Sequence, residues 1–292
     1  MSPTPRVVVV TRPTEYDELL ATHGTRGQAA FFLSTRGRDI AELEERHQLT
    51  HRAIEAAVAA IPVDWRRGVV ERTDVARFLF SPDDVVMVVG QDGLVANVAK
   101  YLDGQPVIGI DPEPGRNAGV LVTHSPGDVA ELLRASDQVT ERTMVEARLD
   151  DGQHLLALNE IFIGHPSHQT ARYDLHTSDG SGEAQASSGV IVATGSGATG
   201  WCRSVALERH SGLSLPSPDE PRLAWFVREA WPSPATGTTL TEGELMGTER
   251  ALTIKSDRLV AFGDGIEADA LTLTWGQTVR VGQSTKALRL VS

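Results

Sequence analysis

The stretch VVMVVGQDGLVANVAKYL, Val85 to Leu102, decides the fold of the first part of the chain. Its first five residues are apolar and mostly β-branched, which predicts a strand buried on both faces. Gly90 then permits a tight turn, and apolar residues from Leu94 onward recur at helical spacing. Open parallel sheets bind ligands at such strand-to-helix turns, and helix N-termini favour anions. Asp92 is therefore either a simple N-cap or a carboxylate at a binding site.

Further apolar runs extend this unit in both directions. RVVVVT at Arg6–Thr11 and PVIGI at Pro106–Ile110 predict strands, and Gly68–Arg72 gives a weaker strand signal. A helical pattern runs from about residue 39 to residue 61, and Pro62 ends it. Strands that alternate with helices predict a parallel sheet with right-handed crossovers.

The pattern of predicted secondary structure changes after Ile110. A short helix is predicted over Pro126–Ala135, and from Val139 onward short alternating strands follow one another between turn residues. This spacing is typical of antiparallel β architecture. We therefore expect an α/β domain over residues 1–122, which carries the GQDG turn, and a β-rich domain over residues 123–292.

The composition of the chain argues against several classes of binding partner. The chain has 292 residues, a formal net charge of −12 and a pI near 5.2, which argues against binding to nucleic acid or to an anionic membrane. Its single cysteine, Cys202, excludes an intrachain disulfide. The N-terminus lacks the pattern of a signal peptide, and no apolar run reaches membrane-spanning length. We expect a soluble, cytoplasmic protein without nucleic-acid or membrane partners.

Two motifs in the β-rich half suggest a binding site. Asn159 and Glu160 interrupt the apolar run HLLALNEIFIG, which predicts one strand over residues 154–164. Such polar residues need partners, so the pair either satisfies a neighbouring loop or bonds the vicinal hydroxyls of a ligand. The small residues of Thr194–Gly200 suit a tight turn or close contact with a phosphate or base, and Trp201 either stacks on that base or closes a core.

Three other features give weaker signals. GDG at Gly263–Gly265 is, by itself, an ordinary turn. His165 and His168 lack a third ligand at suitable spacing, so no metal site built from protein side chains is predicted. Cys202 has no evident base near it in the sequence, and we expect it to be structural.

These motifs form one series along nearly the whole chain. The series consists of GQDG at Gly90–Gly93 (GGDG in the family below), PVIGIDPEPGRNAG at Pro106–Gly119, LNEIFIG at Leu158–Gly164, SSGVIVATGSGATGW at Ser187–Trp201 and GDG at Gly263–Gly265, with ERHQ at Glu45–Gln48 and WFVRE at Trp225–Glu229. In this order it resembles the NAD kinases, and within them it looks most like the mitochondrial type. The LNEIFIG stretch followed by the glycine-rich stretch is a specific combination.

The resemblance implies a fold, a reaction and an assembly. The family joins an N-terminal α/β domain to a C-terminal β-rich domain that carries the nucleotide acceptor, and NAD binds in the crevice between them. The implied reaction transfers a phosphoryl group from ATP, with Mg²⁺ or another divalent cation, to the 2′-hydroxyl of the adenosine ribose of NAD, giving NADP. The resemblance also implies at least a homodimer.

The resemblance further implies roles for single residues. Asp92 would be the catalytic residue, which orients or deprotonates the hydroxyl beside the metal–phosphate group. Asn159 and Glu160 would hold ribose hydroxyls, while Thr199, Gly200 and Trp201 stand at the family's adenine-contacting Thr-Ala-Tyr positions. The positions implied to bind substrate or cofactor are Gly90, Gln91, Gly93, Asn159, Glu160, Thr199, Gly200, Trp201 and Ser204.

Three positions depart from the family pattern. Gln91 replaces the second glycine of GGDG, where a side chain would crowd a phosphate lying against the turn. Leu94 replaces a hydroxyl residue of the family pattern. Ser188 stands where bacterial-type members have Asp, although the mitochondrial type also has Ser at this position. Gln91 and Leu94 leave open a non-catalytic NAD(P)-binding protein. Gly200 and Trp201, in place of Ala and Tyr, leave open a kinase on the same scaffold that acts on a sugar, polyol or nucleoside.

Overall fold

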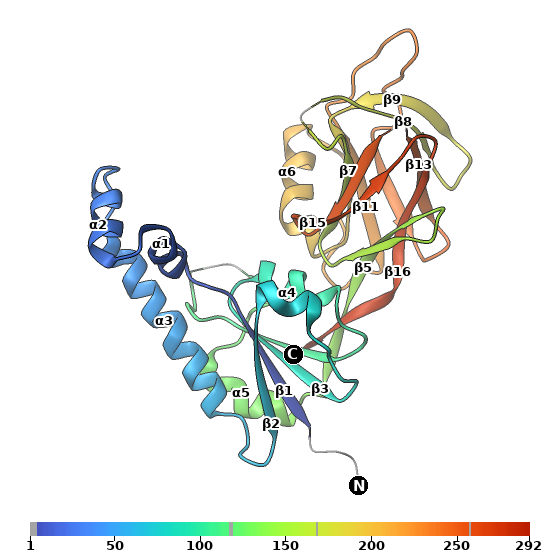
Figure 1. The fold of residues 1–292 in the computed structure, drawn as a ribbon. Coiled ribbons are helices and arrows are strands. Elements are labelled where there is room, and N and C mark those ends of the chain that lie inside the picture. The colour runs from blue at the N-terminus through green and yellow to red at the C-terminus, as the bar shows by residue number, and fades with distance from the viewer. Residues whose placement is uncertain (1–4, 117–118, 168, 257) are drawn as a thin grey trace. The chain divides into compact units, whose positions relative to one another are not determined.

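The protein, seen in a computed structural model that describes residues 5–116, 119–167, 169–256 and 258–292, divides into two compact units. The first unit is Met1–Thr140 together with Arg289–Ser292, and the second is Glu141–Leu288. Figure 1 shows helices around a central sheet in the first unit and mostly strands in the second. An α/β part followed by an antiparallel β part is the predicted fold class, which is confirmed.

A parallel sheet forms the centre of the first unit. Its strands lie in the order β2-β1-β3-β4, and the last residues of β16 continue the sheet beside β4 in parallel, with Arg289 opposite Pro106. The strands are β1 (Arg6–Thr11), β2 (Arg66–Glu71), β3 (Asp84–Val89), β4 (Pro106–Ile110) and the end of β16 (Thr278–Val291). The predicted strands over residues 6–11, 85–89 and 106–110 are therefore confirmed.

Helices connect these strands. They are α1 (Glu15–His23), α2 (Arg26–Ser34), α3 (Ile40–Ala59), η1 (Arg72–Arg77), α4 (Asp92–Ala99), η2 (Pro126–Asp128) and α5 (Val129–Arg134). The helices predicted near residues 39–61 and 126–135 are confirmed by α3 and by η2 with α5. Helices α1 and α2 are additional, and they share a small core of their own with the start of α3, built on Tyr16, Leu33 and Leu43.

Successive strands are added to the sheet in opposite directions on either side of the parallel pair β1 and β3. From β1 the chain crosses through α3 to β2 on one side, whereas from β3 it crosses through α4 to β4 on the other. Because both crossovers are right-handed as a rule, α3 and α4 cover opposite faces of the sheet. Alternate residues of β1, Val7 with Val9 and Val8 with Val10, are accordingly all fully buried. The carboxyl ends of β1 and β3 thus form a topological switch point.

The second unit is built from antiparallel strands in two sheets. One has the order β12-β11-β10-β7-β14-β15, and the other joins β16, β13, β8 and β9, with β5 and β6 at its side. The strands are β5 (Val139–Leu149), β6 (His154–Ala157), β7 (Glu160–Gly164), β8 (Ala171–His176), β9 (Gly182–Ser187), β10 (Gly189–Ala193), β11 (Arg222–Arg228), β12 (Glu242–Met246), β13 (Ala251–Ser256), β14 (Leu259–Gly263) and β15 (Ile266–Leu273).

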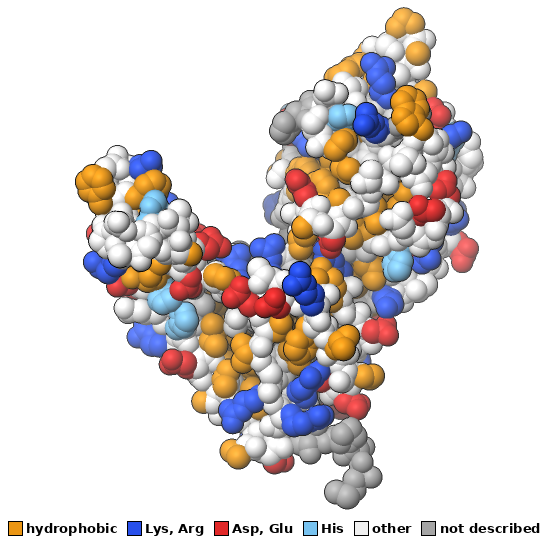
Figure 2. Space-filling view, viewed as in Figure 1, with side chains coloured by type: hydrophobic (Ala, Val, Ile, Leu, Met, Phe, Trp, Pro, Cys, Tyr) orange, Lys and Arg blue, Asp and Glu red, His pale blue; other side chains and the backbone are white. Residues whose placement is uncertain are grey.

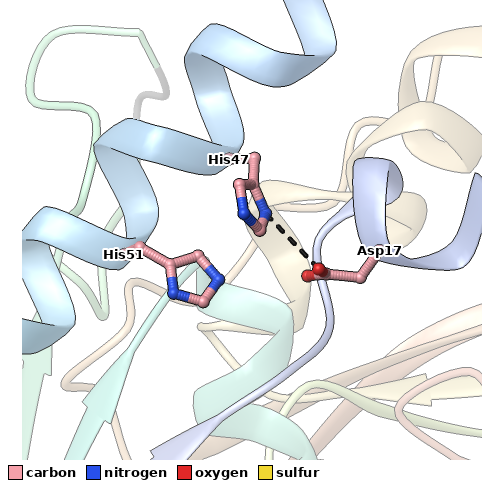
Figure 3. A group of neighbouring side chains, drawn as sticks. All are labelled: Asp17, His47 and His51. Atoms are coloured by element: carbon pink, nitrogen blue, oxygen red, sulfur yellow. Dashed lines mark ion pairs between the residues drawn. The ribbon is translucent and has the colours of Figure 1, made fainter. Parts of the chain in front are cut away.

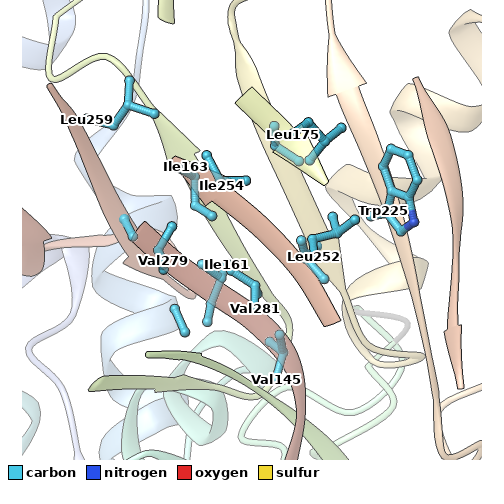
Figure 4. Close-up of a cluster of buried hydrophobic side chains, with 14 of the residues drawn as sticks. Val145, Ile161, Ile163, Leu175, Trp225, Leu252, Ile254, Leu259, Val279 and Val281 are labelled. Atoms are coloured by element: carbon cyan, nitrogen blue, oxygen red, sulfur yellow. The ribbon is translucent and has the colours of Figure 1, made fainter. Parts of the chain in front are cut away.

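An apolar core lies between these two sheets. Figure 4 shows side chains from both, among them Ile161 and Trp225 from one sheet and Leu252 and Val281 from the other. Helix α6 (Trp201–Glu208), preceded by the turn η3 (Gly197–Thr199), packs Cys202 and other apolar residues on strands β10 and β11. The strands that carry the Asn-Glu and Gly-Asp-Gly motifs, β7 and β14, are neighbours in one sheet.

The run HLLALNEIFIG departs from the prediction of a single strand. The strand is broken after Ala157, so β6 pairs with β5 in one sheet while β7 pairs with β10 and β14 in the other. The break falls at Leu158 and Asn159, because the backbone N–H groups of both residues bond the side chain of Asp264 instead of a strand. Asn159 therefore lies in the break and Glu160 is the first residue of β7, so neither residue of the polar pair is in a strand interior.

The boundary between the two compact units lies between Thr140 and Glu141. The segment after residue 122 belongs to the first unit, because α5 buries Val129, Leu132 and Leu133 in its core. The division into functional domains near residue 122 stays a prediction. Within the described residues, no helix has the length and apolar character needed to cross a membrane.

Candidate functional site

The GQDG turn, Gly90–Gly93, joins β3 to α4 at the switch point of the first unit. Gly90 donates its N–H to the carbonyl of Ile110 at 3.0 Å, which ties the turn to the end of β4. Gln91 is the N-cap residue of α4 but gives no side-chain cap, and Asp92 begins the helix. Local sequence therefore builds this turn: a buried strand ends at a glycine and a helix starts two residues later.

The carboxylate of Asp92 is held by backbone of a different segment. Its Oδ2 accepts from the N–H of Val120 at 2.7 Å, and its Oδ1 accepts from Leu121 at 3.1 Å and Val122 at 3.0 Å. This approach requires glycine at position 119, where a Cβ would lie 2.6 Å from Oδ1. Because a carboxylate has about four acceptor positions, three bonds fix its orientation and leave about one position for a ligand.

A small cleft lies beside the GQDG turn, between the segments that follow β1 and β3. It has a volume of about 50 Å³, and its lining includes Arg12, Thr14, Arg46, Gln91 and Glu113. The Arg46 guanidinium is 3.3 Å from a carboxylate oxygen of Glu113, while Arg12 is exposed. Arg46 also lies 3.4 Å from Glu15, which lines the same cleft, so two carboxylates compensate its charge. Arg12 and the N-terminus of α4 are left to attract a phosphate group.

In the second unit, Asp264 fixes the turn that carries Asn159 and Glu160. Its carboxylate accepts from the N–H of Leu158 at 2.9 Å and of Asn159 at 2.7 Å, while its own N–H donates to the Glu160 carbonyl at 3.1 Å. Asp264 adopts φ 54°, in the left-handed region that aspartate tolerates better than most residues. The GDG motif, an ordinary turn by sequence alone, is therefore a support for the Asn-Glu pair.

The glycine-rich turn, Thr194–Gly200, packs against the same pair. Thr194 donates from its N–H to the Asn159 carbonyl at 2.9 Å and from its hydroxyl to the Leu158 carbonyl at 2.5 Å. At Gly197 a Cβ would lie 2.1 Å from the Asn159 carbonyl oxygen and 3.0 Å from Glu160 Oε2. The small residue at 197 is thus needed for close packing of two backbones.

The side chains of Asn159 and Glu160 remain available for a ligand. Both are partly buried, and neither makes a side-chain hydrogen bond to any part of the chain that the structure describes. Burial, and then the nearby charge of Asp264, raise the pKa of Glu160 to about 7. Partial burial of a carboxyl group that accepts no hydrogen bond lowers the stability of the fold. Such groups are typical of binding sites, where a ligand supplies the missing hydrogen bonds.

Neighbouring residues provide exposed groups and an aromatic wall. Thr199, Gly200 and Ser204 are exposed, and the Ser204 hydroxyl donates to the Gly200 carbonyl at 3.4 Å. The Trp201 indole stacks on Phe162 with ring centroids 5.6 Å apart. Both aromatic rings, together with Ser188 and Arg228, line a cavity of about 760 Å³ in the second unit.

Other residues singled out from the sequence also have clear surroundings. Leu94 is 2% exposed, so the departure at this position places a core side chain where the family pattern has a hydroxyl. Burial, and then the charge of Glu160, raise the pKa of the Cys202 thiol to about 12, which is consistent with a structural residue. His165 is partly buried at the 760 Å³ cavity, whereas His168 is outside the described residues.

The structure thus brings together two groups of predicted residues. Gly90, Gln91, Asp92 and Gly93 share the turn in the first unit, and the pairs Asn159–Glu160 and Thr199–Trp201 share one region of the second. Sequence reasoning did not assign roles to Gly119, Gly197 or Asp264, although all three lie within the quoted motifs. That the two groups meet in one crevice stays a prediction.

A parallel α/β unit with a carboxylate-bearing turn, combined with an antiparallel β unit that presents an Asn-Glu pair, is the two-domain architecture of NAD kinases. The sequence is 25% identical to the human protein "NAD kinase 2, mitochondrial" over 77% of this chain and 70% of that protein. It is 25% identical to the rat protein of the same name over 77% of this chain and 73% of that one. No family model matches the chain. The chain is a distant homologue of these mitochondrial NAD kinases, which supports its assignment to the NAD kinase family.

Proposed function

We propose that this protein is an ATP-dependent NAD kinase, which phosphorylates the 2′-hydroxyl of the adenosine ribose of NAD and gives NADP. The observation that carries the proposal is the pair Asn159 and Glu160. Their backbone is fixed by Asp264 and by the glycine-rich turn, while their side chains lack partners within the described chain. An amide and a carboxyl group held side by side match the hydroxyls of a ribose.

The distant homology with proteins named NAD kinase supports the nucleotide as acceptor. Thr199, Gly200 and Ser204 are exposed near the pair and would contact the adenosine. The cavity beside Trp201 and Phe162 is large enough for the remaining part of a dinucleotide, and Arg228 at its wall offers a charge for a phosphate. The assembly that we propose is a homodimer, as in the family.

The first unit would bind the phosphoryl donor. Arg12 at the cleft, and the N-terminus of α4 behind Gln91, would bind the phosphates of ATP. A divalent cation such as Mg²⁺ would neutralise charge on these phosphates. The phosphate oxygens of ATP would provide ligands for such a hard cation, which leaves the free acceptor position of Asp92 for the attacking hydroxyl.

In the reaction, the ribose 2′-oxygen forms a bond to the γ-phosphorus as the bond between that phosphorus and the ADP oxygen breaks. Asp92 orients the attacking hydroxyl and accepts its proton as the new bond forms. Its three backbone hydrogen bonds fix the position of the carboxylate, which suits orientation. Phosphoryl transfer depends mainly on such positioning and on charge neutralisation.

The test is an assay of purified protein with ATP, Mg²⁺ and NAD for formation of NADP. We expect Asp92→Asn to lower turnover by orders of magnitude with nearly unchanged NAD affinity, and Asp83→Asn, an exposed acid in the same unit, to behave as the parent. NAD that binds to the parent without any formation of NADP would refute the proposal. A rate unchanged in Asp92→Asn would refute the role of Asp92 alone.

Gln91 favours a second candidate, a non-catalytic NAD(P)-binding protein, because its side chain lies at the cleft where phosphates are expected. Gln91→Gly should then create or greatly raise kinase activity. Leu94→Thr is a poor companion, since Leu94 is buried and the change would disturb the core. A parent that is already fully active would exclude this candidate, and a thermal-shift screen of nucleotides against polyols tests a different acceptor.

A further inference from the structure

Two helices of the first unit bring two histidines and an aspartate together. His47 and His51 lie one turn apart on α3, and Asp17 lies on the first turn of α1. Figure 3 shows both imidazoles on the side of α3 that faces Asp17, and Figure 2 shows histidine side chains side by side on this surface. One nitrogen of each imidazole and one carboxylate oxygen all lie within 4.8 Å of one another.

The carboxylate of Asp17 divides its two oxygens between different roles. Oδ2 accepts from the N–H and the hydroxyl of Thr14, at 2.8 and 2.7 Å, and thereby caps α1. Oδ1 is directed at His47, with its Nδ1 at 3.5 Å. The same His47 nitrogen lies 2.9 Å from the Thr14 hydroxyl, which an ion bound at this nitrogen would replace. The hydrogen bonds from Thr14 hold the Asp17 carboxylate in a fixed position.

The spacing fits a small ion. Two ligands of a tetrahedral zinc ion, each at about 2.0–2.2 Å from the metal, are about 3.3 Å apart, close to the 3.5 Å between Asp17 and His47. The His51 ring centroid is 4.2 Å from that of His47, and His51 is exposed, so a side-chain rotation would complete the set. Two imidazoles and one carboxylate suit Zn²⁺ rather than Mg²⁺, which prefers oxygen ligands.

We propose that Asp17, His47 and His51 bind one Zn²⁺ ion or an ion of similar preference, with water at the fourth position. Such an ion links α1 to α3. It also connects to the cleft, because His47 and Thr14 both line that cleft beside Gln91. Binding therefore stiffens one wall of the cleft. The site uses no residue of the proposed NAD kinase reaction, so its test does not depend on that function.

The experiment titrates tag-free protein with ZnCl₂ at neutral pH by calorimetry and repeats the titration with MgCl₂. We expect one high-affinity equivalent of zinc per chain, no comparable signal from magnesium, and a rise in the melting temperature with zinc. His51→Ala should weaken zinc binding by about tenfold or more. This variant leaves the fold unchanged because His51 is exposed and Asp17 keeps its capping role.

The matched control is His154→Ala, which removes an exposed histidine at the start of β6. It should bind zinc as the parent does. Cys202 does not compete for the ion, because it is fully buried. Absence of zinc binding in the parent would overturn the proposal. Equal zinc affinity in the parent and in His51→Ala would also overturn it, since the ion would then bind elsewhere.

Discussion

Replacing Glu160 by glutamine should stabilise the protein at alkaline pH. The glutamine amide has nearly the same shape as the carboxyl group but is always neutral. It therefore avoids both the cost of burying a charge and the repulsion from Asp264. Burial and the Asp264 charge raise the pKa of Glu160 from 4.5 to about 7 in the folded state. The folded protein therefore binds this proton more tightly than the unfolded chain does, and its stability depends on pH at this residue.

The sign and size follow from this difference. Below about pH 4.5 both states bind the proton and the penalty is absent, whereas the free energy of unfolding falls as the pH rises through about 7. The rise from 4.5 to about 7, at about 1.4 kcal/mol for each pKa unit, corresponds to a limit of about 3.5 kcal/mol. Since Glu160 is only partly buried, we expect Glu160→Gln to gain ~1–3 kcal/mol near pH 8.

Urea denaturation at about pH 4 and at about pH 8 measures the effect, with the parent as reference. The gain from Glu160→Gln should be present at the higher pH and nearly absent at the lower one. The control Glu249→Gln changes an exposed glutamate of the same unit and should show no such difference. A gain that is equal at both pH values, or absent at both, would refute the assigned cause of the raised pKa. The same variant should bind NAD more weakly, because the proposed site loses a carboxyl acceptor.

Three substitutions test the supports of the site. Gly119→Ala places a Cβ 2.6 Å from the Asp92 carboxylate, so we expect turnover to fall by on the order of 100-fold while NAD binding persists. Gly197→Ala forces a Cβ within 2.1 Å of the Asn159 carbonyl oxygen, which should lower the free energy of unfolding by about 1–3 kcal/mol in urea denaturation. Asp264→Asn removes a charge and one acceptor; it should cost about 2 kcal/mol and abolish part of the pH dependence of the Glu160→Gln gain.

Matched glycines provide the controls for the first two substitutions. Alanine at Gly68 in the first unit or at Gly212 in the second meets no atom within 4 Å. Both control variants should keep the activity and stability of the parent. If Gly119→Ala or Gly197→Ala behaved like its control, the close approaches would not constrain the site.

Local patterns in the sequence determined most of the secondary structure. The β-branched run before Gly90 predicted β3, and the helical spacing after it predicted α4, because such patterns report burial along one chain segment. The same reasoning missed α1 and α2, whose apolar faces contact each other and the start of α3 rather than the main core. The capping residues Thr14 and Thr25 were the available signals for both helices.

The sequence by itself determined that an aspartate follows the buried strand, and that an Asn-Glu pair and a glycine-rich stretch follow in the second half. Tertiary structure decided what holds them. The Asp264 carboxylate accepts from the N–H of Asn159 across more than a hundred positions of sequence, and the N–H of Val120 donates to the Asp92 carboxylate across 28. Such bonds depend on the path of the whole chain, whereas periodicity depends only on neighbours. The contact of Asp17 with His47 is hidden from sequence for the same physical reason.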